Sequence, residues 1–156
     1  MNILFLLKPK SNIVYLSGSN TIRQGIEKFR AHGYTAVPVI DNDGKYLGTI
    51  SEGDFLWNIV NENNFELKDN EHKYIYSIIR QNYNQAIKVD TSMEDLFERI
   101  TNQNFVPVVD DRNFFVGIIT RKDVINYLRE NQKWFSLVLI YSIYTCITIN
   151  CIYIVK

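Results

Sequence analysis

The sequence of 156 residues contains only two cysteines and has no net charge. Cys146 and Cys151 are spaced in a way that fits neither a zinc site nor the disulfide framework of a small secreted domain, so we expect a reducing compartment. Because 17 basic residues balance 17 acidic ones, the basic surface required for nucleic-acid binding is not expected. The apolar content of 46% predicts one compact globular unit or two very small ones.

The N-terminus does not have the pattern of a signal peptide. Its apolar stretch, Ile3 to Leu7, is too short, has no basic residue before it and runs into Lys8-Pro9. We therefore expect these residues to begin the folded part.

The sequence also has no recognisable catalytic motif. It contains neither a Walker loop nor a dinucleotide fingerprint. Neither His32 nor His72 has a neighbouring set of acid, cysteine or hydroxyl residues that would make a triad or a metal site. We predict that both are surface residues, that the chain has no metal site or catalytic cofactor, and that it is not an enzyme.

An internal repeat organises the sequence. A shift of 69 residues aligns residues 37–54 with residues 106–123 without a gap. Seven of the eighteen aligned positions are identical, whereas unrelated sequences would match at about one. The identical positions of the first copy are Val37, Pro38, Val39, Asp41, Gly48, Ile50 and Asp54.

Each copy is expected to have the order β-α-β-β-α, which places the chain in the α/β (α+β) class. Expected strands are 13–16, 34–40 and 46–51 in the first copy, and 86–89, 105–109 and 114–120 in the second. Turns 41–44 and 110–113 would close the two hairpins. Apolar periodicity predicts the first helix of each copy around residues 22–29 and 93–100, and the second over 54–61 and 122–130.

The ends of the first helix in each copy have recognisable signals. Thr21 to Gln24 and Thr91 to Glu94 have the form of capping boxes. Gly33 is expected to end the helix of the first copy, and Asn102 or Asn104 that of the second. The predicted domains are residues 1–70 with a polar link, residues 71–131, and an apolar tail over residues 132–156.

A hydroxyl and an aspartate recur where a strand meets a helix, in Ser51 with Asp54 and in Thr120 with Asp123. Free N–H groups at a helix start attract anions such as phosphate, and a hydroxyl can bind the same oxygen. An aspartate can accept hydrogen bonds from ribose hydroxyls, so the pair suggests a nucleotide. These are also the residue types that cap helices, and capping alone is the alternative interpretation.

The two copies resemble a tandem pair of cystathionine β-synthase (CBS) domains, the Bateman module. The resemblance covers residues 1–131 and rests on segments 34–39, 48–54, 105–108 and 117–123, "YTAVPV", "GTISEGD", "FVPV" and "GIITRKD". The layout is similar to small stand-alone CBS proteins of Gram-positive bacteria. It implies two repeats packed about a pseudo-two-fold axis, with clefts for adenine nucleotides such as AMP, ADP, ATP, cyclic di-AMP or S-adenosylmethionine as regulatory ligands.

The resemblance also implies roles for individual residues. Asp54 and Asp123 would bind ribose, and Ser51 and Thr120 would bind phosphate. The adenine pockets would be lined by Thr35, Ala36, Val37 and Pro38 and by Asn104, Phe105, Val106 and Pro107.

The charges differ between the two strand-to-helix corners, the first at Ser51 to Asp54 and the second at Thr120 to Asp123. Arg121 and Lys122 would assist phosphate binding at the second corner, whereas Glu52 places an anion at the first. We therefore predict that the second site binds the charged nucleotide and that the first is weaker, empty or suited to a ligand with less phosphate. The alternative is that Arg121 and Lys122 are only solvated residues at a helix start.

The C-terminal tail departs from the family. Residues 134–155, "WFSLVLIYSIYTCITINCIYIV", carry no charge and are long enough to span a membrane, which would make the chain a tail-anchored cytoplasmic protein. Two alternatives are an accidental extension that is not a selected part of the fold and a segment that packs on the fold or binds a partner.

Two functions remain open at this point. The first is a regulatory module that senses an adenine nucleotide and signals to an unknown effector protein. The alternative is a non-catalytic dimerisation or scaffold protein with empty clefts. A homodimer is expected in both cases, because the helices that follow the corners have apolar faces.

Overall fold

The computed structural model describes residues 2–61, 72–80 and 83–131. It divides into two compact units, residues 1–121 and residues 122–156. The last described helix, 121–131, begins at the boundary between them. Among the residues described, no helix is both long and apolar enough to span a membrane. The predicted apolar segment 134–155 lies outside the described residues.

Two sheets form the framework of the first unit. One has the order β2-β3-β4, with β2 Leu16–Ser17, β3 Ala36–Ile40 and β4 Tyr46–Ser51. The other has the order β1-β7-β6-β5, with β1 Lys8–Pro9, β5 Ile87–Lys88, β6 Phe105–Val109 and β7 Phe115–Thr120. In each sheet an antiparallel hairpin carries one short parallel strand, β2 on β3 and β5 on β6.

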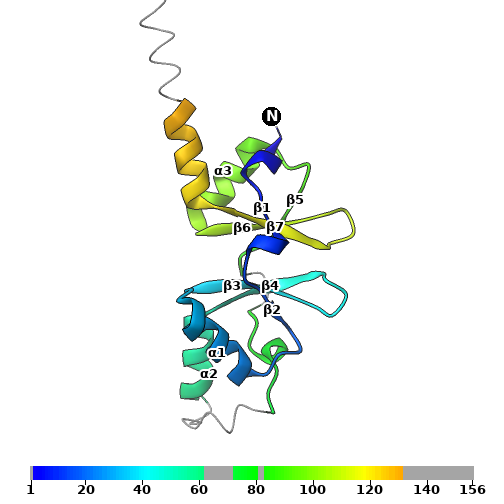
Figure 1. Cartoon of the computed structure of the whole chain (residues 1–156), viewed down its shortest axis with the longest axis vertical. Coiled ribbons are helices and arrows are strands. Elements are labelled where there is room, and N and C mark those ends of the chain that lie inside the picture. The colour runs from blue at the N-terminus through cyan, green and yellow to red at the C-terminus, as the bar shows by residue number, and fades with distance from the viewer. Residues whose placement is uncertain (1, 62–71, 81–82, 132–156) are drawn as a thin grey trace, which may run out of the picture. The chain divides into compact units, whose positions relative to one another are not determined.

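The helices of this unit cover the outer faces of the two sheets. Helices α1, Ile22–His32, and α2, Glu52–Asn61, lie on one side of the first sheet, and α3, Met93–Asn102, lies on the outer side of the second (Figure 1). Short 3₁₀ helices occur at η1 Ile3–Leu6, η2 Lys10–Asn12 and η4 Ile75–Ser77. The predicted β-α-β-β-α order is thus confirmed in both copies, with helix 121–131 as the last element of the second.

The two hairpins meet in a symmetric way that demonstrates the pseudo-two-fold axis. The N–H of Tyr46 donates to the carbonyl of Asn113, and the N–H of Phe115 donates to the carbonyl of Gly44. These pairs exchange when the repeat shift of 69 residues is applied. Gly44 and Asn113 both have positive φ, 90° and 68°, the conformation that glycine and asparagine tolerate best.

Helix α1 begins and ends as its sequence predicts. The Thr21 side chain accepts from the N–H of Gln24, whose side chain accepts from the N–H of Thr21. Gly33 ends the helix in the left-handed conformation, with φ 64°. A capping box and a glycine cap are local interactions, so the sequence alone specifies both ends.

The predicted ends of α3 are wrong. Its N-cap is Ser92, not Thr91, and the Ser92 side chain accepts from the N–H of Asp95. At the other end, Gln103 is extended with φ −128°, so neither Asn102 nor Asn104 forms a left-handed cap. A tertiary contact explains the difference at the C-terminal end. There the guanidinium of Arg121 donates to the carbonyls of Ile100, Thr101 and Gln103.

The predicted strand at 13–16 is shorter and later, because only Leu16 of that segment belongs to β2. The 3₁₀ helix η2 ends at Asn12, and Ile13 and Val14 line a pocket described below. Their apolar character therefore reflects the pocket rather than a strand. The predicted strand 86–89 is likewise shorter, Ile87–Lys88.

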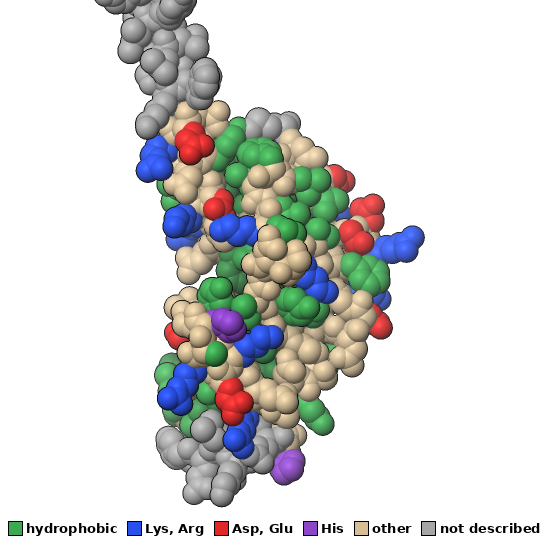
Figure 2. Space-filling view, viewed as in Figure 1, with side chains coloured by type: hydrophobic (Ala, Val, Ile, Leu, Met, Phe, Trp, Pro, Cys, Tyr) green, Lys and Arg blue, Asp and Glu red, His purple; other side chains and the backbone are tan. Residues whose placement is uncertain are grey.

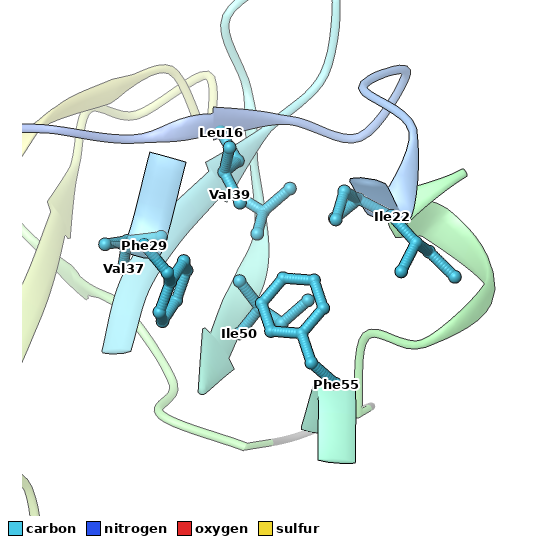
Figure 3. Packing of buried hydrophobic residues seen from close by; sticks show 8 residues of the cluster. Leu16, Ile22, Phe29, Val37, Val39, Ile50 and Phe55 are labelled. Carbon is cyan, nitrogen blue, oxygen red and sulfur yellow. The ribbon is translucent and has the colours of Figure 1, made fainter. Parts of the chain in front are cut away.

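The core of the first repeat is formed by side chains from α1, α2 and the facing sheet (Figure 3). Phe55 points from α2 toward Ile50 of the sheet, and its ring meets that of Phe29 edge to face at 5.1 Å. The buried members of this cluster are Leu16, Ile22, Phe29, Val37, Val39, Ile50, Phe55 and Ile75. Gly25 lies in the middle of α1 because a Cβ there would be 2.9 Å from the Phe55 ring.

The two repeats exchange their preceding segments. The segment before the first repeat packs on the second repeat, and the segment before the second repeat packs on the first. Strand β1 pairs with β7 of the second repeat, Lys8 with Ile118 and Pro9 with Gly117. The N-terminal residues are thus folded as predicted, with Ile3 and Leu6 buried. Segment 73–80 instead packs on the first repeat, where Ile75 is fully buried and its N–H donates to the carbonyl of Asn20.

The repeated glycines are the points at which these segments cross the hairpins. A Cβ on Gly117 would lie 2.1 Å from the carbonyl oxygen of Lys8, and one on Gly48 would lie 2.7 Å from the Ile79 side chain. Only glycine leaves room for the crossing backbone at position 117. The two glycines of the motif are therefore explained by packing.

Replacing Thr21 with alanine is expected to lower the free energy of unfolding by about 1 kcal/mol, because the N–H of Gln24 at the start of α1 loses the hydroxyl that accepts its hydrogen bond. Urea unfolding of the two proteins measures this difference. Thr101→Ala, the same change at an exposed site late in α3, is the control and should alter stability by less than about 0.5 kcal/mol. Equal losses in the two variants would contradict the capping role.

Candidate functional site

The first corner joins β4 to α2. The carboxylate of Asp54 accepts from the N–H of Ser51 at 2.7 Å and from its hydroxyl at 2.6 Å. Asp54 is 8% exposed, which is unusual for an aspartate. The predicted capping interaction is therefore present, with the aspartate in the third position of the helix.

An arginine that sequence reasoning did not identify completes this corner. The Nε of Arg80 lies 2.6 Å from Oδ1 of Asp54, and its Nη2 lies 3.5 Å from the Ser51 hydroxyl. The guanidinium also stacks on the ring of Tyr83, 3.8 Å from its centroid. The first corner thus carries a cation beside the predicted anion Glu52, and no local sequence signal reveals it because Arg80 is 26 residues from Asp54.

At the second corner Thr120 ends β7 and Arg121 follows it. Arg121 lies beside the corner in the sequence, but its guanidinium donates to the last carbonyls of α3. The structure thus gives this side chain a structural contact in place of the predicted phosphate contact. Lys122 and Asp123 belong to the second unit, and their predicted roles remain predictions from the sequence motif.

The backbone at both corners is partly engaged already. The N–H of Glu52 donates to the carbonyl of Thr35, and the N–H of Arg121 donates to the carbonyl of Asn104. These two bonds are related by the repeat shift of 69 residues. The first N–H after each strand is therefore used within the fold, and an anion at either corner would depend on the next N–H groups and on side chains.

A pocket of about 550 Å³ lies within the first unit, beside Thr120. Its lining residues come from the N-terminal segment and from both repeats: Lys8, Asn12, Ile13, Val14, Tyr34, Thr35, Ala36, Val37, Pro38, Asn104, Phe105, Ile118 and Thr120. Its walls are mainly apolar, with Lys8 and Thr120 among the polar groups. This size and lining are typical of small-molecule sites.

Six of the eight residues predicted for the adenine pockets line this one pocket. They are Thr35, Ala36, Val37, Pro38, Asn104 and Phe105. Val106 and Pro107 are not among the lining residues, and Val106 is fully buried in β6. The contributions of Lys8, Ile13 and Val14 were missed, because only the path of the N-terminal segment brings them here.

The pocket that the repeat shift relates to this one is smaller, about 290 Å³, and half of its lining residues carry side-chain amides. Its lining residues are Ala36, Thr49, Tyr83, Asn84, Asn102, Gln103, Asn104 and Phe105. Thr49 stands at the position that the repeat shift relates to Ile118. Its hydroxyl accepts from the Asn84 amide at 3.1 Å and lies 2.9 Å from the hydroxyl of Tyr46.

Tyr46 fixes this polar arrangement. Its hydroxyl donates to the carbonyl of Asn84 at 2.8 Å. Burial raises the pKa of the Tyr46 phenol above its usual value, and the hydrogen bond with Thr49 lowers it by a smaller amount. The phenol therefore remains a hydrogen-bond donor at neutral pH.

In the view of Figure 2, acidic and basic side chains are interspersed and neither sign forms a wide patch. Among the described residues, no group of three metal-ligating side chains comes together. His32 is exposed and stacks on Tyr34, and His72 is exposed, so both predicted surface histidines are found there.

Comparison with known proteins gives a consistent family. The sequence profile of the CBS domain matches residues 6–61 and 79–130. A CBS domain-containing protein of Dictyostelium discoideum is 24% identical over 142 residues, which are 82% of this chain and 92% of that protein.

Solved structures share the fold. The structure of CbpB in complex with c-di-AMP has a TM-score of 0.80 and 22% identity, covering 87% of this chain and 89% of that one. The structure of CBSX2 in complex with AMP has a TM-score of 0.68 and 22% identity, covering 84% and 98%.

Proposed function

This chain belongs to the CBS domain family, and we propose that it is a regulatory module that binds an adenine nucleotide in the pocket beside Thr120. The single observation that carries the proposal is the pocket itself, which gathers six predicted adenine-contacting residues within the first unit. The adenine ring would pack between apolar side chains such as Val14 and Ile118. The volume of about 550 Å³ is within the range of nucleotide-sized ligand sites.

Polar groups in the same lining would bind the rest of the nucleotide. The hydroxyl of Thr120 can donate to a phosphate oxygen, and the ammonium of Lys8 offers a charge of the opposite sign. On the sequence motif, Asp123 remains our proposed ribose-binding residue and Lys122 a proposed phosphate-binding residue. Lys8 takes the part that sequence reasoning gave to Arg121.

Related folds support an adenine ligand. CbpB has been crystallised with c-di-AMP and CBSX2 with AMP. We propose that this chain responds to a ligand of the same class and that the bound state differs from the free state in its affinity for an effector protein. Such a response requires the nucleotide to bind the two states with different affinities.

We further propose that the chain forms a homodimer through α2. Leu56, Trp57 and Val60 of this helix are 56%, 62% and 42% exposed, which is high for neighbouring apolar side chains. The same observation favours the second candidate function, a scaffold whose apolar helix mediates association while the clefts remain empty. Ligand binding separates the two candidates, because the scaffold needs none.

A tryptophan at Val14 is expected to abolish nucleotide binding, because its indole ring would occupy the proposed adenine position. A nucleotide present at 100 times its dissociation constant stabilises the protein by about 2.7 kcal/mol. A thermal-shift panel of AMP, ADP, ATP, cyclic di-AMP, S-adenosylmethionine and NAD should therefore show a rise in Tm for the wild-type chain and none for Val14→Trp.

Leu4→Trp is the matched control, since Leu4 is exposed and does not line the pocket. This variant should respond like the wild-type chain. If Val14→Trp retains the full shift, the nucleotide binds elsewhere. If no compound stabilises the wild-type chain, the scaffold becomes the better description.

A further inference from the structure

The first corner already holds a positively charged group where a ligand would bind. Both carboxylate oxygens of Asp54 are engaged, Oδ1 by Nε of Arg80 at 2.6 Å and Oδ2 by the N–H and hydroxyl of Ser51. A ribose diol must donate two hydrogen bonds to such a carboxylate. It therefore cannot bind Asp54 in the expected way while Arg80 remains.

Two contacts hold the guanidinium of Arg80, although its side chain is 52% exposed. Its guanidinium stacks on Tyr83 at 3.8 Å, so one face of the planar group is covered. Asp54 has only 6% of its side chain exposed, and a buried carboxylate needs a cation or several hydrogen bonds. The ion pair satisfies that need without a ligand.

Two small pockets lie near the first corner. One, of about 310 Å³, is lined by Ser51, Asp54 and Arg80 among others, and the other is lined by Tyr83 and Asn84 among others. Polar groups of the protein fill part of the second. Asn84, which has a positive φ of 58°, donates from its amide to Thr49 and accepts at its carbonyl from Tyr46. Of these residues, Thr49 has the position that the repeat shift relates to Ile118, which belongs to the apolar wall of the larger pocket. The resulting space of about 290 Å³ is close to half of the 550 Å³ in the other pocket.

We propose that Arg80 acts as an internal ligand of Asp54 that excludes ribose from the cleft at the first corner, the first cleft, so that each chain binds a single nucleotide. This inference rests on the proposed function for the other pocket. At the first corner, Arg80 takes the place that ribose would have on Asp54. Part of the space for the base is taken by the hydrogen-bonded side chains of Tyr46, Thr49 and Asn84. The sequence repeat would then encode one ligand site and one structural copy of it.

Removing the arginine is the direct test. Isothermal titration of the full chain with AMP, and separately with cyclic di-AMP, should give one site per chain for the wild type and a second site for Arg80→Gln. If the ion pair is formed about 99% of the time, its removal strengthens binding at the first cleft about a hundredfold, so the wild-type titration shows only the other site. Arg112→Gln, in the exposed turn before β7, is the control and should retain one site.

Two further variants assign the sites. Arg80→Gln combined with Asp54→Asn should lose the second site, and Arg80→Gln combined with Val14→Trp should retain only the site at the first cleft. Binding by Arg80→Gln but not by the wild type would reject the function proposed for the larger pocket and keep only the role of Arg80 at the first cleft.

Other results would overturn the inference. These are two sites in the wild-type chain, unchanged stoichiometry in Arg80→Gln, or weaker binding in that variant, which would make Arg80 a ligand contact. If none of the proteins bound either nucleotide, both proposals would fail and the ion pair would be only structural.

Discussion

Alanine in place of Gly117 is expected to lower the free energy of unfolding by about 3 kcal/mol, the upper part of the range for overpacking. The added Cβ would lie 2.1 Å from the carbonyl oxygen of Lys8 and 3.0 Å from its carbonyl carbon. Both atoms belong to the backbone of β1, which is paired with β7 at this point. A backbone cannot rotate away as a side chain can, so β1 must separate from the sheet.

Gly48→Ala is the matched control for this prediction, because Gly48 has the same place in the first repeat. There the Cβ would meet the Cγ2 methyl of Ile79 at 2.7 Å, and that side chain can move. We expect a loss of about 1 kcal/mol. Urea unfolding of both variants measures the difference, and equal losses would show that the crossing of β1 over Gly117 is not rigid.

Truncation of Phe55 to alanine is expected to cost about 3 to 5 kcal/mol, the usual range for a buried phenylalanine. Phe55 is 5% exposed and packs edge to face on Phe29. Its ring fills the space between α1, α2 and the first sheet, as Figure 3 shows. The neighbours cannot close this space fully, because α1 is held at both ends by its caps.

The next residue provides the control. Leu56 is 56% exposed, and Leu56→Ala should change the stability of the monomer by less than about 0.5 kcal/mol. Thermal or urea unfolding at low protein concentration compares the two variants. If the loss for Leu56→Ala grows with protein concentration, the side chain is buried in an assembly, as the proposed homodimer requires.

The repeat, the hairpins and the corners could be predicted from the sequence because each depends on residues close together in the chain. Asp41 and Asp110 illustrate this, since each accepts hydrogen bonds from N–H groups two and four residues later. These hydrogen bonds are local, and the aspartate that accepts them occurs in both copies of the repeat. The cap of α1 was predicted for the same reason.

The parts that could not be predicted depend on distant contacts. Arg80 reaches Asp54 from the segment before the second repeat, and Lys8 reaches the larger pocket from the segment before the first. Neither residue belongs to the repeated pattern, so comparison of the copies could not identify them. The predicted C-terminal cap of α3 was wrong because it too depends on a distant residue. Arg121 supplies the contacts that a local cap would have made.

The crossing of β1 onto the second repeat has a consequence for synthesis on the ribosome. Lys8 is made early, but its partner Ile118 follows 110 residues later. Until then the apolar side chains of Ile3 and Leu6 have no sheet beside them, while the first hairpin can already form. We expect β1 to pair at the edge of the second sheet only when β7 has left the ribosome. The second repeat therefore completes its folding after residue 120 has been synthesised.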